Sequence, residues 1–195
     1  MIDQDELVAV LQKIRGDTIV IPTMSVARPW NDSSDRPARD VPVSGAMGKA
    51  SSFALGVALA QPDTKVIVLD GDGSLSMNLG SLATIAGKAP KNLFHFVLHN
   101  GVYAVTGGQP IPSAERVDFS EMAEGAGYAA TYDFEDLEDF TIQIEEVLKQ
   151  EGPVFVTIRS VPAIQNEPIG RRERPARPRT LISAMTELRQ ELGIE

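Results

Sequence analysis

Short apolar runs and longer amphipathic stretches alternate along the chain. The apolar runs show no polar alternation and predict buried strands at 18–21, 65–69, 93–98 and 154–158, with a further strand expected at 128–132. Apolar side chains spaced three and four residues apart predict helices at 5–15, 49–60, 79–87, 119–124, 136–150 and 181–192. Buried strands that alternate with helices are typical of a parallel sheet. The pattern therefore predicts an α/β fold, a doubly wound parallel sheet with helices on both faces.

Two stretches fall outside this alternation. Residues 28–37 are polar and belong to a connection of about twenty residues, a length that often has a function in compact domains. Residues 171–179 contain five arginines and two prolines, which favours a solvated tail or, alternatively, a contact with a partner chain or an anionic ligand. We expect one main domain at 1–165, followed at 166–195 by the Arg/Pro-rich segment and a C-terminal helix that packs on the domain or on a partner.

Composition narrows the classes of function. The chain has 195 residues, of which 43% are apolar, and this suits one globular domain with a substantial core. The lack of cysteine excludes disulfides, thiolate metal sites and cysteine nucleophiles. A formal net charge of −9 argues against non-specific binding to nucleic acid. No apolar segment is long enough for a bilayer, and the start is acidic where a signal peptide would be basic, so we expect a cytoplasmic protein without membrane contact.

Two polar loops follow neighbouring predicted strands. The first is Gly71-Asp72-Gly73-Ser74, whose glycines let the backbone approach a ligand closely. The helix expected next would present free N–H groups to an anion such as phosphate. A carboxylate there would repel phosphate unless a cation lay between them, so we interpret Asp72 as a ligand of a divalent ion, although the motif is also common in simple turns. Asn100 follows the next strand and adds an amide oxygen, a donor that suits Mg²⁺.

Three segments, in this order, resemble thiamine-diphosphate-dependent enzymes. They are residues 45–60 (GAMGKASSFALGVALA), 66–92 (VIVLDGDGSLSMNLGSLATIAGKAPKN) and 99–109 (HNGVYAVTGGQ). Their motifs are similar to the pyrophosphate-binding (PP) domain of 2-oxoacid decarboxylases, and they resemble in particular the β subunit of sulfopyruvate decarboxylase and the C-terminal half of phosphonopyruvate decarboxylase. The likeness covers about residues 18–158. It implies the thiamine-diphosphate-binding fold, with thiamine diphosphate and Mg²⁺ as cofactors.

The resemblance also implies roles for individual residues. Asp72 and Asn100 would bind Mg²⁺ through their side chains, and Val102 would bind it through its carbonyl oxygen. Gly73 and Ser74 would contact the diphosphate through the backbone and the hydroxyl group. The complete cofactor-binding set comprises Gly45, Ala46, Met47, Gly71, Asp72, Gly73, Ser74, Asn100, Val102, Tyr103 and Ala104.

The two catalytic candidates each have a structural alternative. Met47 falls where the family has a bulky apolar residue that bends the cofactor, but a methionine would equally suit the core. Thr106 lies where the family's loop approaches the reacting centre, but together with Gln109 it would equally order that loop. His99 and Ala104 differ from the residues usual in the family, which leaves contacts with the substrate open.

Four residues outside the motifs carry weaker expectations. Thr23 and Ser25 end the first predicted strand and are expected near the diphosphate. Trp30 lies in the stretch that resembles a variable loop of the family, which borders the cofactor or a subunit interface. His95 is expected to be a hydrogen-bonded residue of a buried strand.

The chain has no room for a second α/β domain. In the family that the chain resembles, a glutamate of a pyrimidine-binding (PYR) domain activates the cofactor, so we expect it on a partner subunit of a hetero-oligomer with at least two copies of each chain. The expected activity is decarboxylation of a small 2-oxo acid, with sulfopyruvate or phosphonopyruvate as the nearest analogy. A carboligase similar to acetolactate synthase and a non-catalytic cofactor-binding module are alternatives. A generic nucleotide-binding domain is disfavoured, because the chain has neither a GxGxxG motif nor a P-loop.

Overall fold

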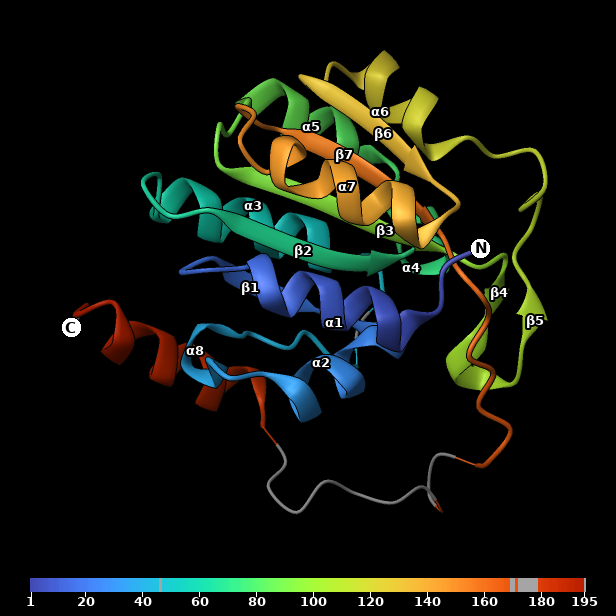
Figure 1. The fold of residues 1–195 in the computed structure, drawn as a ribbon, viewed down its shortest axis with the longest axis horizontal. Coiled ribbons are helices and arrows are strands. Elements are labelled where there is room, and N and C mark those ends of the chain that lie inside the picture. The colour runs from blue at the N-terminus through green and yellow to red at the C-terminus, as the bar shows by residue number, and fades with distance from the viewer. Residues whose placement is uncertain (46, 169–170, 172–178, 195) are drawn as a thin grey trace.

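Five parallel strands form the centre of the fold (Figure 1). The computed structural model describes residues 1–45, 47–168, 171 and 179–194. The sheet has the strand order β1-β2-β3-β7-β6, and its strands are β1 (Ile19–Pro22), β2 (Val66–Gly71), β3 (Leu93–His99), β7 (Val154–Arg159) and β6 (Ala130–Phe134). A small antiparallel pair follows β3 and consists of β4 (Val102–Tyr103) and β5 (Gln109–Pro110). The doubly wound parallel sheet that the sequence predicts is confirmed.

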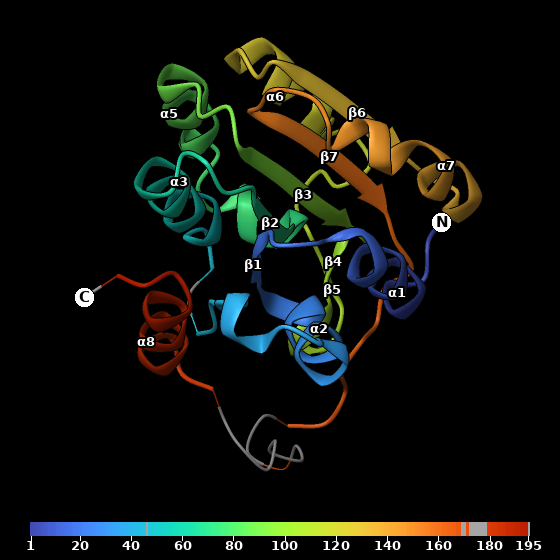
Figure 2. The same ribbon diagram turned by 60° about the vertical axis from the view of Figure 1, so that its left-hand side comes forward.

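Helices cover both faces of the sheet (Figure 2). One face carries α3 (Ala50–Ala60), α5 (Gly80–Lys88), α6 (Phe119–Ala126) and α8 (Leu181–Glu191). The other carries α1 (Gln4–Ile14), α2 (Ala27–Ser33) and α7 (Leu137–Val147). The short helices are η1 (Met24–Val26), η2 (Pro37–Arg39), α4 (Asp72–Ser76) and η3 (Ala104–Thr106). Within the described ranges, no helix combines the length and the apolar character that a bilayer crossing requires.

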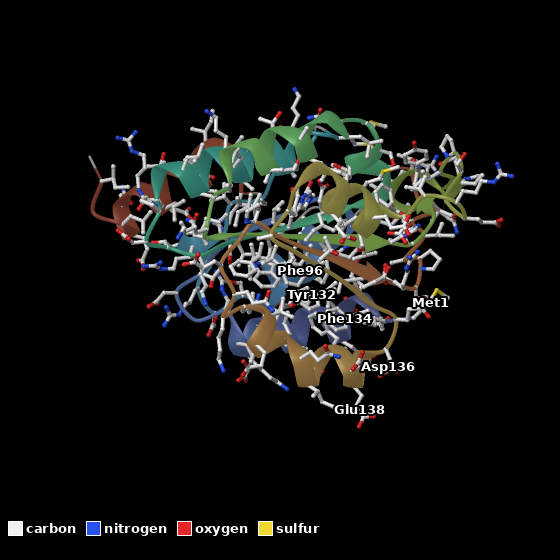
Figure 3. All side chains as sticks on the ribbon, turned by 90° about the horizontal axis from the view of Figure 1, so that it is seen from above. Met1, Phe96, Tyr132, Phe134, Asp136 and Glu138 are labelled. Atoms are coloured by element: carbon white, nitrogen blue, oxygen red, sulfur yellow. The ribbon has the colours of Figure 1, made fainter. Side chains whose placement is uncertain are left out.

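The two faces of the sheet bury two separate apolar cores. Successive side chains of a strand point to opposite faces, so Val68 packs under α3 whereas Leu69 packs on the side of α1. In Figure 3 the sheet is seen from its edge, and Phe96 and Phe134 lie on the side that faces α7. There the ring of Phe134 meets the ring of Phe140 edge-on at a centroid distance of 5.3 Å. Burial on both faces explains why the strands are apolar throughout.

Most predicted elements lie within two or three residues of the observed ones, but the interpretation of residues 28–37 as a loop is wrong. This stretch contains residues 28–33 of α2 and the first residue of η2, Pro37. Its one large apolar side chain, Trp30, is fully buried among residues of α1, β1 and β2. Burial of this indole stabilises the short helix, because a large aromatic side chain removes a large apolar area from water. The mostly polar sequence around Trp30 does not reveal this helix.

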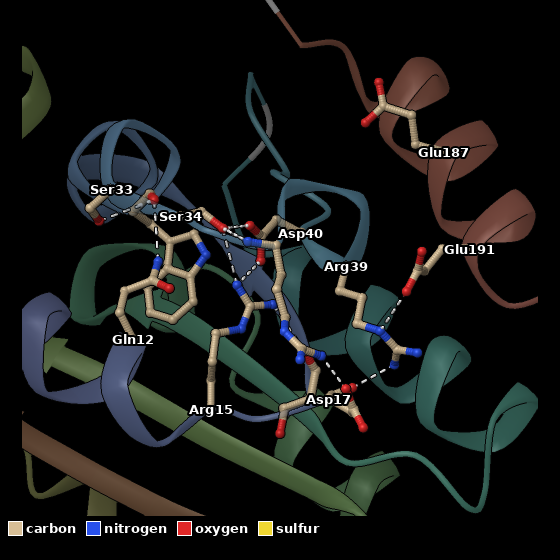
Figure 4. Close-up of polar contacts among 12 residues, drawn as sticks. Gln12, Arg15, Asp17, Ser33, Ser34, Arg39, Asp40, Glu187 and Glu191 are labelled. Atoms are coloured by element: carbon tan, nitrogen blue, oxygen red, sulfur yellow. Dashed lines mark hydrogen bonds and ion pairs between the residues drawn. The ribbon is translucent and has the colours of Figure 1, made fainter.

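A buried ion pair attaches this segment to the sheet (Figure 4). Arg15 Nη1 lies 2.7 Å from Asp40 Oδ1, and the two side chains are 2% and 0% exposed. Ser34 donates a hydrogen bond to the same carboxylate. From Asp40 the backbone runs parallel to β1, with the N–H groups of Val41 and Val43 donating to carbonyls of β1. The ion pair therefore fixes the start of the segment that leads to Gly45 at the carboxyl edge of the sheet.

The C-terminal helix α8 packs against the same core as α3. It buries Ala184 and Leu188, and its first turn is closed by a capping box between Thr180 and Ser183. Near its end, Glu191 forms an ion pair with Arg39 of η2 at 3.2 Å. Residues 172–178 of the Arg/Pro-rich segment lie outside the described residues. The division into 1–165 and 166–195 stays a prediction.

Candidate functional site

The carboxyl ends of β2 and β3 bring Asp72 and Asn100 together. The two strands are neighbours, and the loops that follow them lie side by side as the sequence predicts. Asp72 Oδ2 accepts the N–H groups of Asn100 at 2.9 Å and Gly101 at 2.7 Å, while its Oδ1 accepts the N–H of Gly73 at 2.8 Å. The side chain is almost fully buried. These hydrogen bonds hold one carboxylate rigidly between two loops that are far apart in the sequence.

A chain of polar side chains supports Asp72 from behind. His99 Nε2 lies 4.0 Å from Asp72 Oδ2, and His99 Nδ1 lies 2.8 Å from Arg159 Nη1. A guanidinium group can only donate, so Nδ1 accepts this hydrogen bond. Arg159 is in turn paired with the carboxylate of Asp133 at 2.8 Å. Burial raises the pKa of Asp72 and lowers the pKa of His99, so both groups favour their neutral forms more than they would in water.

The donors at this point fit a hard divalent cation. Asp72 Oδ1 accepts one N–H group, and Asn100 Oδ1 accepts the N–H of Val102 at 3.0 Å, so each oxygen keeps a lone pair. Backbone amides and an imidazole do not neutralise a buried carboxylate as a cation would. Within the part of the chain that the structure describes, no group of three acidic or histidine side chains gathers into a metal site. Further oxygen atoms, such as those of a bound phosphate, would have to complete the coordination of Mg²⁺.

The loop that carries Gly45 and Met47 is joined to the Asp72 loop by two hydrogen bonds. Gly48 donates its N–H to Ser74 Oγ at 3.0 Å, and Asn78 Nδ2 donates to the carbonyl of Gly48 at 2.8 Å. Ser74 keeps its own hydroxyl hydrogen for a ligand. The sequence analysis missed Asn78, and the signal available was an amide side chain between the apolar residues that follow the GDGS motif.

A small cavity of about 60 Å³ lies between these loops. A side chain at position 73 would fill part of it, because a Cβ atom on Gly73 would lie 2.7 Å from Cε1 of Tyr103. Complete pockets for cofactors usually measure hundreds of cubic ångströms. The cavity by itself is therefore too small for a whole cofactor.

Most of the predicted site residues gather at this cavity. Its lining includes Met47, Gly71, Asp72, Gly73, Ser74, Asn100, Val102, Tyr103, Ala104 and Thr106, together with Met24, Ser25 and Val105. Gly45 does not line it, and Ala46 lies outside the described residues. Thr23 is buried beside the cavity and donates its hydroxyl to the carbonyl of Val43 at 2.6 Å. Trp30 is buried in the core on the side of α1 and does not line the cavity, and the expectation that its stretch borders the cofactor or a subunit interface stays a prediction.

The polar side chains of Thr106, Gln109 and His95 differ in how far their hydrogen-bonding groups are satisfied. Thr106 and Gln109 hydrogen-bond each other across the turn between β4 and β5, with Gln109 Nε2 donating to the Thr106 carbonyl at 2.9 Å. The catalytic role of Thr106 stays a prediction. His95 Nδ1 lies 3.2 Å from the hydroxyl of Tyr128, but among the described residues its Nε2 has no hydrogen-bond partner and lies 3.8 Å from Asp70 Oδ2. The expectation of a hydrogen-bonded strand histidine is confirmed for one ring nitrogen only.

Comparison with known proteins agrees with this geometry. The family described as "Thiamine pyrophosphate enzyme, C-terminal TPP binding domain" matches residues 23–158. Over 112 residues the chain is 46% identical to phosphonopyruvate decarboxylase of Streptomyces hygroscopicus, a match that covers 57% of this chain and 27% of that protein. Over 125 residues it is 41% identical to sulfopyruvate decarboxylase subunit beta of Methanothermobacter thermautotrophicus, and the match covers 64% of each. The chain thus spans less than two thirds of the length of these relatives.

A solved structure shares the fold. The thiamine diphosphate-dependent 4-hydroxybenzoylformate decarboxylase of Rhodococcus jostii superposes with a TM-score of 0.71 and 23% identity, over 85% of this chain and 33% of that one. The family match is the stronger finding, because it extends over well more than half of the chain and includes every loop of the site. The chain therefore belongs to the thiamine pyrophosphate enzymes, where it corresponds to the C-terminal domain that binds thiamine pyrophosphate (thiamine diphosphate).

Proposed function

We propose that this chain is the PP-domain subunit of a thiamine-diphosphate- and Mg²⁺-dependent 2-oxoacid decarboxylase, a carboxy-lyase whose active site is shared with a separate PYR-domain subunit. The observation that carries the proposal is the buried carboxylate of Asp72, held beside Asn100 at the carboxyl ends of β2 and β3. Ligands of open α/β sheets bind at this edge. When bound, thiamine diphosphate supplies the electron sink for the carbanion chemistry of decarboxylation.

In this proposal different residues of the cavity bind different parts of the cofactor. Asp72 and Asn100 hold Mg²⁺ through their side chains, and Val102 holds it through its carbonyl oxygen. The hydroxyl of Ser74 donates to the diphosphate, which the N-terminal end of α4 also favours. Met47 supports the cofactor from the opposite loop. The remaining members of the set are Gly45, Ala46, Gly71, Gly73, Tyr103 and Ala104, with Thr106 toward the reacting centre.

A partner subunit completes the site in this proposal. The cavity of about 60 Å³ is far smaller than a site for a whole cofactor, which supports a composite pocket between chains. We assign the activating glutamate to that partner. Residues 1–165 would form the cofactor-binding domain, and residues 166–195 would form the Arg/Pro-rich segment and a C-terminal helix that packs on the domain or on a partner. A cysteine-free composition is compatible with a cytoplasmic location.

The substrate class is proposed from the relatives. Two of them are named for decarboxylation of phosphonopyruvate and sulfopyruvate, which are small 2-oxo acids with an anionic tail. We propose a substrate of that class. Product analysis separates decarboxylation from carboligation, because the first releases an aldehyde and the second forms a carbon–carbon bond.

Calorimetry tests the proposal. Thiamine diphosphate with Mg²⁺ is titrated into the full chain alone and into the chain with its co-purifying partner, and binding is expected to be tight only in the complex. Asp72→Asn replaces the charged oxygen of the proposed metal ligand with a neutral amide and should weaken Mg²⁺-dependent binding by about 10- to 100-fold. Asp63→Asn changes an exposed carboxylate and serves as the matched control. Absence of binding in the wild-type complex, or equal binding by Asp72→Asn, would refute the proposal.

A further inference from the structure

Two side chains in and after α4, those of Ser74 and Asn78, form hydrogen bonds with both backbone polar groups of Gly48. Ser74 Oγ accepts the N–H of Gly48 at 3.0 Å, and Asn78 Nδ2 donates to the carbonyl of the same residue at 2.8 Å. Ser74 lies in α4 and Asn78 in the turn between α4 and α5, two and six residues after Asp72. The two side chains therefore clamp the Gly48 peptide groups from the side of the proposed metal ligand.

The approach of the two segments is close enough to require glycine. Gly48 has a φ of +71°, a conformation that other residues rarely adopt. A Cβ atom there would lie 3.2 Å from the Cβ atoms of both Asn78 and Met77. The backbone of the loop thus rests directly on the turn after α4, and the amide of Asn78 completes the contact.

These two hydrogen bonds, the clamp, lie between two halves of the proposed site and join them. Asp72 and Ser74 belong to the half that would hold Mg²⁺ and the diphosphate. Met47 precedes Gly48 and belongs to the half that would hold the rest of the cofactor. Asn78 is not among the residues that line the cavity, and its amide contacts the Met47 loop at the carbonyl of Gly48.

We propose that Asn78 is a positioning residue, which acts through the Gly48 carbonyl to hold the Met47 loop at a fixed distance from the Asp72 loop. The inference rests on the proposed function, since it concerns the alignment of the two halves of a thiamine-diphosphate site. Loss of one neutral hydrogen bond corresponds to a factor of about 3 to 10 in binding. That factor should appear only for ligands that span both halves.

Two ligands distinguish a loss of alignment between the two halves from a general loss of binding. Inorganic pyrophosphate with Mg²⁺ contacts the Asp72 half alone, whereas thiamine diphosphate with Mg²⁺ spans both halves. In the full chain with its co-purifying partner, Asn78→Ala should weaken thiamine diphosphate about 3- to 10-fold and leave pyrophosphate unchanged. Ser52→Ala is the matched control, because Ser52 Oγ is the weaker partner of the same amide at 3.5 Å, and it should change neither affinity.

Hydrogen exchange of the full chain without ligand gives a second readout. Residues 44–50 should exchange faster in Asn78→Ala than in the wild type, while β3 should be unchanged. Equal weakening of both ligands by Asn78→Ala, or no change in thiamine diphosphate binding, overturns the inference. If the wild type binds neither ligand, the proposed function fails; faster exchange of 44–50 then still supports the clamp, and unchanged exchange overturns it.

Discussion

The buried ion pair between Arg15 and Asp40 leads to a quantitative prediction for Asp40→Asn. The substitution keeps the shape of the side chain and removes its charge. Burial lowers the pKa of Arg15 and Asp40 raises it, so the carboxylate is what compensates the desolvated guanidinium. The remaining hydrogen bonds of Arg15 go to neutral groups, with Nη2 donating to the carbonyl of Thr18 at 3.0 Å and Nη1 to Ser34 Oγ at 3.2 Å, and Asp35 adds a smaller charge effect than Asp40.

The expected loss is large because neither charge can reach water. Breaking a buried pair by removing one partner costs about 3–5 kcal/mol of unfolding free energy. For a chain of this size that loss corresponds to a fall in Tm of about 6–20 °C. The matched control is Glu151→Gln, which removes a carboxylate paired with Lys91 at 3.1 Å where both side chains are about three-quarters exposed. An exposed pair contributes about 0–1 kcal/mol, so the control should lie close to the wild type.

Urea denaturation, followed by tryptophan fluorescence, measures the unfolding free energy of both variants and of the wild type. Trp30 is the single tryptophan and is fully buried, and its ring centroid lies 5.2 Å from Arg15 Cζ, so the signal comes from the same cluster. A change below about 1 kcal/mol for Asp40→Asn would refute the reasoning, because it would mean that the guanidinium is compensated without the carboxylate. The same result would remove our explanation for how the segment leading to Gly45 is anchored.

Three further predictions concern single buried contacts. Asn92→Ala removes donors to three backbone carbonyls at and after the end of α3 and should lower the unfolding free energy by about 1–3 kcal/mol in urea denaturation. Gly73→Ala should cost about 1–3 kcal/mol by overlap with the ring of Tyr103, and most of the loss should be recovered in a double variant with Tyr103→Ala. Burial raises the pKa of Tyr128, so an alkaline ultraviolet titration of the folded chain should miss this tyrosine near the ordinary pKa of about 10, whereas the unfolded chain should show it there. Full ionisation in the folded chain would contradict the burial of that ring.

The fold class and the main loops of the site were accessible from local patterns. Apolar runs such as 66–69 predict strands because both faces of a parallel sheet are buried, and that requirement acts on every residue of the run. The meeting of Asp72 and Asn100 followed from topology alone, since consecutive parallel strands end at the same edge. The family resemblance of these motifs is confirmed by the match over residues 23–158.

Other features depend on contacts between residues distant in the sequence. The helix around Trp30 forms because the indole is buried by α1 and the sheet, and residues 28–37 carry no sign of that partner. Asn78 reaches Gly48 across thirty residues, and Arg159 reaches His99 across sixty. Periodicity and turn preferences describe only neighbours along the chain, whereas a side-chain hydrogen bond depends on the three-dimensional distance between its partners. The sheet and its ligand-binding edge were therefore readable from the sequence, and the clamp on Gly48 and the support behind Asp72 were decided by tertiary packing.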